Sequence, residues 1–360
     1  MRRIIGLVFI ILLVIVVGCG PMRTLEASRD AYSKMEGQSG VNDVTMPDPN
    51  DDWFLVDLSK KYGLMALFAL TVYRYDLSPN DRDRHACDYL NPDFSGDRNF
   101  GMPMHSDHRS EFGRWVRWVP AESAEGDEPP CYTENGLFYE TYVHFDSHDK
   151  ITEGVIAYRG TENRKGQWAK DWGANIGNAM GIEPEAYAIA RTRLKKLTNR
   201  LSAASNGAPI YAVGHSLGGG LAQQAGYLSK DIKEVYTFNT SPVTNWSSLR
   251  LLGLVEQGCP IIHRIYNGGE GLAGVRSIAT ASTRARYGRH DVGIQFGPKA
   301  FVSGHAMGLI ACNFAKILKE TKAEGAAHDY PVSYIERHVL KRADGKQLES
   351  DRRICDDERS

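Results

Sequence analysis

The chain has 360 residues and a formal net charge of −1 at pH 7, from 43 basic and 44 acidic side chains. This balance lacks the basic excess of a nucleic-acid-binding surface, so no nucleic-acid partner is expected. Hydrophobic residues make up 42% of the sequence, and a chain of this length can bury a large core. The composition therefore indicates a globular protein and leaves its oligomeric state open.

The N-terminus has the pattern of an export signal. Residues 1–3 carry two arginines, residues 4–18 are apolar or glycine, and Cys19 follows. The apolar run falls short of a membrane span, which favours a cleaved signal peptide over residues 1–18, with an uncleaved signal anchor as the alternative. The residues before Cys19 resemble a bacterial lipobox. That resemblance implies a lipidated Cys19, a membrane anchor and, because Gly20 is not aspartate, an outer-membrane location in the cell envelope.

Composition divides the rest of the chain. Residues 19–52 are polar and are predicted to form a flexible tether, whereas residues 53–340 are long enough for one large domain. Within that domain, residues 76–135 are rich in Asp, Arg, Pro and Gly. We interpret them as a lid-like insertion, since long loops in compact domains are usually functional. The charged residues 341–360 are predicted to be a solvated tail.

Five cysteines remain if Cys19 is lipidated. Cys87 and Cys131 fall in loop-like regions, where a disulfide between them could hold the insertion. Cys312 lies in an apolar helical run and is predicted to be a buried thiol. Cysteine and histidine spacings do not match a zinc site, so no structural metal is predicted.

Predicted strands alternate with predicted helices. Residues 137–145 and 154–158 form an expected antiparallel hairpin around the turn-like 146–150. The pattern predicts further strands over 210–213, 235–238 and 261–266, and helices over 64–75, 184–201, 221–230 and 305–319. Such alternation indicates an α/β fold with a mostly parallel sheet covered on both faces.

The strongest motif is Gly214-His215-Ser216-Leu217-Gly218, which follows an apolar strand and precedes a helix-like segment. A strand, a tight turn and a helix form the context in which G-x-S-x-G builds a nucleophile elbow. The turn projects the serine hydroxyl at the edge of the sheet, near a helix N-terminus. Ser216 is therefore predicted to be a nucleophile, and the Leu217 N–H could hold a developing oxyanion.

Three blocks of residues resemble class 3 lipases, the fungal-type branch of the α/β-hydrolase fold. They are Ala157–Thr161 with Lys170–Trp172 and Asn175, Val213–Gly220 with Thr237–Thr240, and His305–Met307. The resemblance spans roughly residues 53–320 and implies an α/β-hydrolase fold. It also implies that Thr161, which follows Arg-Gly, shares the oxyanion hole with Leu217.

A serine hydroxyl at pH 7 needs a base within hydrogen-bond reach, and histidine suits this role. His305 matches the family's histidine, and His290, in what reads as a basic loop, is the alternative. His215 lies inside the elbow and is expected to point away from the reacting group. His263 lies within a predicted strand.

The acid of the catalytic triad departs from the family pattern. The family usually has an aspartate shortly after the strand predicted over residues 261–266, whereas this sequence reads Asn-Gly-Gly-Glu-Gly there, and Glu270 is the candidate acid. Glutamate can serve in this role. Asp291 is the rival, Asp231 is less suitable, and a damaged triad is the remaining alternative. Asp171 is interpreted as a structural carboxylate that supports the turn carrying Thr161.

These residues predict a serine esterase or lipase that cleaves lipid carboxylic esters through an acyl-enzyme, without a metal or organic cofactor. The resemblance points to acylglycerols or phospholipids as substrates. Two alternatives remain open: a hydrolase of another acyl substrate, such as a thioester or peptide, and a non-catalytic envelope lipoprotein that uses the fold for binding.

Overall fold

The structure is a computed structural model. It describes residues 52–75, 77, 80–91, 115–120, 126–161, 185–241, 243, 249, 253–254, 261–268, 289–296 and 303–331. The predicted signal peptide, lipidated Cys19, almost all of the tether and the charged tail lie outside these ranges. Among the helices that are described, none combines the length and the apolar character needed to cross a bilayer.

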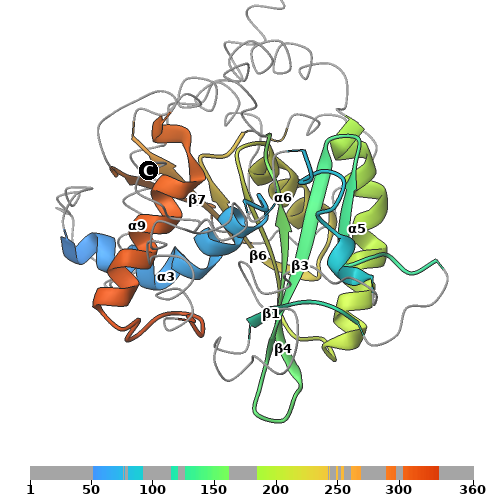
Figure 1. Ribbon diagram of the computed structural model, residues 1–360, viewed down its shortest axis with the longest axis horizontal. Coiled ribbons are helices and arrows are strands. Elements are labelled where there is room, and N and C mark those ends of the chain that lie inside the picture. The colour runs from blue at the N-terminus through green and yellow to red at the C-terminus, as the bar shows by residue number, and fades with distance from the viewer. Residues whose placement is uncertain are drawn as a thin grey trace, which may run out of the picture.

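The described strands form one eight-stranded mixed sheet (Figure 1). The order is β1-β3-β4-β5-β6-β7-β8, and β2 also pairs with β3. Pairs that involve β1, β2 or β3 are antiparallel, whereas β4 to β8 run parallel to one another. The bounds are β1 Trp115–Arg117, β2 Cys131–Glu134, β3 Leu137–Phe145, β4 Ile151–Tyr158, β5 Ile210–His215, β6 Ile232–Phe238, β7 Ile261–Asn267 and β8 Arg289–Ile294.

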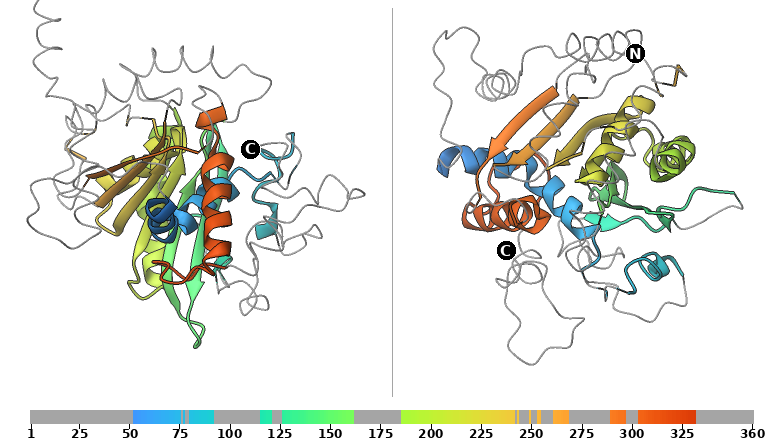
Figure 2. Two further views of the ribbon diagram at one scale, coloured as in Figure 1. Left: turned by 90° about the vertical axis from the view of Figure 1, so that its left-hand side faces the viewer. Right: turned by 90° about the horizontal axis from the view of Figure 1, so that it is seen from above.

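Helices cover both faces of this sheet (Figure 2). Helices α3 (Asp52–Thr71) and α9 (Met307–Glu320) pack together on one face, and α5 (Glu185–Ala204) and α6 (Leu217–Leu228) lie on the other. Both faces of the sheet are apolar, and each packs against its own pair of helices in one apolar cluster. Strand β5 shows why, because its successive side chains point alternately into the two clusters. Tyr211 and Val213 join the α3–α9 side, whereas Ile210 and Ala212 join the α5–α6 side. The predicted α/β architecture with a doubly covered, mostly parallel sheet is thus confirmed.

The described part of residues 76–135, the predicted insertion, contributes β1 and β2 to the sheet. One local prediction needs correction: His290, predicted to lie in a basic loop, belongs to strand β8. The polar sequence of β8 is buried because Asp291 pairs with Arg264 on β7 and because the His290 ring stacks on His263.

Cys87 and Cys131, whose pairing the sequence left open, form a disulfide that joins residues 44 positions apart in the sequence. Cys312 is buried on α9, as predicted, but it is disulfide-bonded rather than a free thiol. Its partner lies outside the described ranges.

Candidate active site

Ser216 occupies a sharp turn between β5, which ends at His215, and α6, which begins at Leu217. Its backbone has φ 55° and ψ −123°, a conformation that side-chain-bearing residues rarely adopt. Such strain persists where the surroundings enforce it, and it is concentrated at functional sites. The Ser216 amide donates to the Phe238 carbonyl, and the Ser216 carbonyl accepts from Ser241, so the turn is tied to the end of β6.

Two glycines make this turn possible. A Cβ on Gly214 would lie 2.7 Å from the Gly219 nitrogen, inside the first turn of α6. A Cβ on Gly218 would lie 2.8 Å from the carbonyl carbon of Tyr158 and would overlap its oxygen. The motif therefore needs glycine on both sides of the serine because strand β4, the turn and the helix approach at backbone distance.

The chain that leaves β4 passes beside Ser216. A Cβ on Gly160 would lie 3.1 Å from the Ser216 Cβ and 2.5 Å from the His215 carbonyl oxygen. Thr161 follows and is exposed, and Leu217, the first residue of α6, is half-buried. The structure thus brings Ser216 together with the turn carrying Thr161 and with a helix N-terminus. Backbone amides in this arrangement can stabilise negative charge on an acyl oxygen.

His305 ends a 3-10 turn, Ser303–His305, immediately before α9. Its ring centroid lies 4.8 Å from that of His215, the neighbour of Ser216. The Asn239 amide donates to the carbonyls of Gly304 and His305, at 3.1 and 3.3 Å. Asn239 in turn accepts from the Asn267 backbone amide at 2.8 Å. Two asparagines at the carboxyl ends of β6 and β7 therefore hold the turn that carries His305.

His215 provides a second link to that turn. Its Nε2 donates to the His305 carbonyl at 2.7 Å, because a carbonyl can only accept. In a neutral imidazole the other nitrogen, Nδ1, is an acceptor, and the Tyr73 hydroxyl lies 2.6 Å from it. The His215 ring thus connects Tyr73, just after α3, to the backbone of His305.

The candidate acids are placed differently. Glu270 lies outside the described residues, two positions after Gly268, whose amide donates to the Ile294 carbonyl at 2.8 Å. Asp291 is buried on β8, and its two carboxylate oxygens accept from Arg264 at 2.6 and 2.5 Å. Asp171 also lies outside the described ranges. Asp231 lies at the amino end of β6, the end opposite to the elbow.

A second polar cluster occupies that opposite end of the sheet. His263 Nε2 lies 3.0 Å from a Glu234 carboxylate oxygen, and the Tyr236 hydroxyl donates to the same oxygen at 2.8 Å. The hydrogen bond from His263, aided by that from Tyr236, lowers the pKa of Glu234 to about 2. Burial lowers the pKa of His263, whose ring is stacked between Tyr236 and His290. His290, the alternative base, thus belongs to this stack.

The described residues thus form a mixed α/β protein with a mostly parallel sheet, and a strained turn at the carboxyl end of β5 carries Ser216. Residues 115–247 match the model of a phospholipase-like family, described as a Tle-like phospholipase domain. This match extends from β1 to beyond β6 and includes Ser216, Thr161 and Leu217. The chain is thus similar to phospholipases over the part that carries the elbow, whereas its membership of the class 3 branch remains a prediction.

Among solved structures, the extracellular lipase LipA from Serratia marcescens matches with 16% identity and a TM-score of 0.28. That comparison covers 53% of this chain and 32% of the lipase, so the chain spans about a third of the length of that protein. No curated protein sequence matches the chain.

The sequence predictions gave no role to Tyr73, Asn239 or Asn267. The sequence signal for Asn239 was an asparagine directly after a predicted strand, and the structure gives it a positive φ of 41°, which asparagine tolerates better than most residues. Tyr73 carried none, since its contact with His215 joins residues 142 positions apart.

Proposed function

We propose that the protein is a serine hydrolase of lipid carboxylic esters, with phospholipids as the first substrate class to test. One observation carries the proposal: Ser216 occupies a strained elbow at a helix N-terminus, with the Gly160 turn beside it. Strain of this kind costs stability and suits a nucleophile better than a structural serine. The phospholipase-like match over residues 115–247 supports the choice of substrate.

In the proposed mechanism, His305 removes the Ser216 proton as the hydroxyl attacks the ester carbonyl. The backbone amides of Thr161 and Leu217 stabilise the oxyanion that forms. Protonated His305 gives its proton to the departing alcohol, which leaves an acyl-enzyme. Water, deprotonated by His305, then releases the fatty acid and restores the serine.

We assign the triad acid to Glu270 in preference to Asp291. Both oxygens of Asp291 bind the Arg264 guanidinium in a buried bidentate pair, and taking one partner from such a pair is costly. Glu270 follows β7, whose last residue, Asn267, belongs to the network that holds His305. The acid fixes the histidine tautomer and stabilises the imidazolium, and glutamate can do both.

We further propose that Cys19 is lipidated and holds the enzyme at a bacterial envelope membrane, where phospholipids lie within reach of the tether. Mass spectrometry of the mature N-terminus tests this idea directly. A mature N-terminus at Cys19, lipidated on its thiol and on its new amino group, is expected, and an intact residue 1 in the membrane fraction would contradict it.

The activity is tested by incubating residues 20–360 with phosphatidylethanolamine and phosphatidylglycerol vesicles and measuring released fatty acid. Ser216→Ala is the matched control because it removes only the hydroxyl. Release by the wild type and none by Ser216→Ala is the expected result. Equal release from both proteins, or none from phospholipids, triacylglycerols and p-nitrophenyl esters alike, would overturn the proposal.

A further inference from the structure

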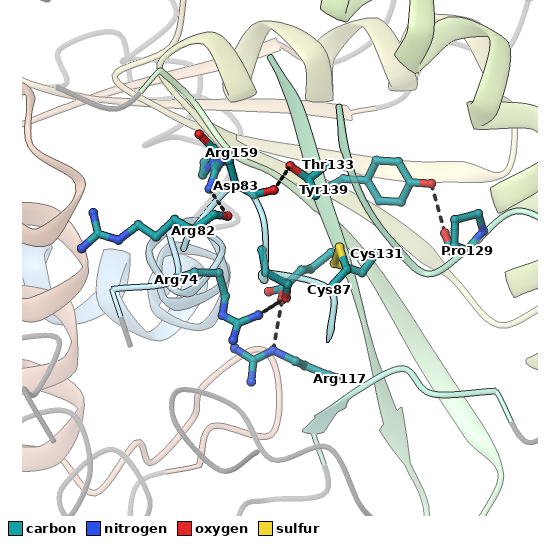
Figure 3. Close-up of a disulfide and its surroundings, with 12 residues drawn as sticks. Arg74, Arg82, Asp83, Cys87, Arg117, Pro129, Cys131, Thr133, Tyr139 and Arg159 are labelled. Carbon is teal, nitrogen blue, oxygen red and sulfur yellow. Dashed lines mark hydrogen bonds and ion pairs between the residues drawn. A yellow bond between two sulfur atoms is a disulfide. The ribbon is translucent and has the colours of Figure 1, made fainter. Parts of the chain in front are cut away.

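A short segment, residues 80–91, is fastened to the sheet by the Cys87–Cys131 disulfide (Figure 3). The Cys87–Cys131 disulfide joins it to β2, where Cys131 lies opposite Glu140 of β3. The segment is therefore linked covalently to a strand pair at one side of the sheet.

Two polar contacts fix the same segment further. The Thr133 hydroxyl donates to the Asp83 carbonyl at 3.1 Å. The buried Arg74 guanidinium donates to the Ala86 carbonyl and, at 3.2 Å, to the fully buried Glu140 carboxylate. Together with the disulfide at Cys87, which follows Ala86 directly, these contacts set the position of the segment relative to β2 and β3.

The fixed segment presents two acceptors to Arg159. One guanidinium nitrogen donates to the Asp83 carboxylate at 2.5 Å, and the other donates to the Arg82 carbonyl at 3.2 Å. The Phe138 ring lies under the guanidinium, 4.4 Å from centroid to Cζ. Figure 3 shows Arg159 reaching from the end of β4 toward Arg82 and Asp83. The planar guanidinium is thus held at two of its nitrogens and on one face.

Arg159 is also the last residue before Gly160 and Thr161. Its backbone amide donates to the Phe138 carbonyl at 3.0 Å, which fixes its main chain to β3. Gly160 has no side chain, and it passes within contact distance of Ser216. The direction in which the chain leaves β4 is therefore set by how Arg159 is held.

We propose that Asp83 is a positioning residue for the oxyanion side of the site, acting through Arg159, and that the Cys87–Cys131 disulfide holds Asp83 in place. The inference rests on the proposed hydrolase function, and it adds to that function a positioning residue that lies outside the catalytic triad. Asp83 itself is half-exposed, so its ion pair contributes little to global stability. Its effect is on geometry, to which catalysis is more sensitive than folding.

The test compares Asp83→Asn, Asp83→Glu and Cys87→Ala/Cys131→Ala with the wild type. Asp88→Asn is the matched control, because Asp88 lies in the same segment and pairs with exposed His85 at 2.7 Å. Hydrolysis of a soluble p-nitrophenyl ester gives kcat and KM, and hydrogen exchange reports on residues 159–161.

We expect Asp83→Asn and the double cysteine variant to lower kcat by about tenfold or more with little change in KM. Exchange at residues 159–161 should become faster in both variants. Asp83→Glu should recover part of kcat, and Asp88→Asn should match the wild type in both measurements. Wild-type kcat and exchange in Asp83→Asn would overturn the inference, as would equal losses in Asp88→Asn.

Failure of the proposed function has a different signature. A wild type without Ser216-dependent turnover would refute hydrolysis, and hydrogen exchange would then decide the positioning role alone. Faster exchange at residues 159–161 in Asp83→Asn supports the role, and unchanged exchange overturns it.

Discussion

The Cys87–Cys131 disulfide gives the most quantitative prediction of stability. The disulfide joins residues 44 positions apart, and removing it frees a loop of that length in the unfolded chain. In the chain-entropy treatment, −2.1 − 1.5R ln n with n equal to 44 is about −13 cal/mol/K, or about 4 kcal/mol at 25 °C. The Cys87→Ala/Cys131→Ala variant should therefore unfold with a free energy lower by about 4 kcal/mol.

Equilibrium unfolding in urea measures this loss. The free energy of unfolding of a domain of this size should fall by about 3 kcal/mol per M of urea, the upper end of the usual range of slopes. The urea midpoint of the variant should therefore lie about 1.3 M below that of the wild type. The melting temperature should fall by about 6 °C, given an unfolding entropy of about 2.1 cal/mol/K per residue over roughly 300 residues. A midpoint within about 0.3 M of the wild type would refute the reasoning, because the loop would then be closed by other contacts in the unfolded state.

Three further predictions concern single side chains. Tyr73→Phe removes the hydroxyl that orients His215, a hydrogen bond worth about 1 kcal/mol, so kcat in steady-state assays should fall about fivefold. An unchanged kcat would contradict the role of Tyr73 in orienting His215. Gly218→Ala places a methyl against the Tyr158 backbone and should lower the free energy of unfolding by about 3 kcal/mol, whereas a wild-type melting curve would show that the elbow is looser than described. The pKa of Glu234 is lowered from 4.5 to about 2, so its contribution to stability is complete above pH 4.5 and is lost as the pH falls toward 2. Glu234→Gln should flatten this part of the curve of urea midpoint against pH, and parallel curves would contradict the assignment.

The strands that could be predicted from the sequence are those with a clear pattern of apolar residues. Strands β3, β5 and β7 carry runs of apolar and aromatic residues, and each lies within a residue or two of its predicted position. Strand β8 was missed because it begins Arg-His-Asp. Its burial depends on Arg264 and His263 from β7, and partners from another strand cannot be seen in a local window.

The candidate site divides in the same way. The elbow around Ser216 is encoded locally, because a strand, two glycines and a helix follow one another in the sequence. The contacts around it are not local. Arg159 meets Asp83 across 76 positions, and Asn239 meets His305 across 66. Side chains that position a site from such distances become visible only when the strands are assembled.

The central claim, that Ser216 is a nucleophile activated by His305, is tested most directly by labelling with a fluorophosphonate probe and mapping the adduct by mass spectrometry. We predict that the wild type is labelled at Ser216, that Ser216→Ala is not labelled, and that His305→Ala is labelled much more slowly. An unlabelled wild type, or a label on another residue that persists in Ser216→Ala, would contradict the account.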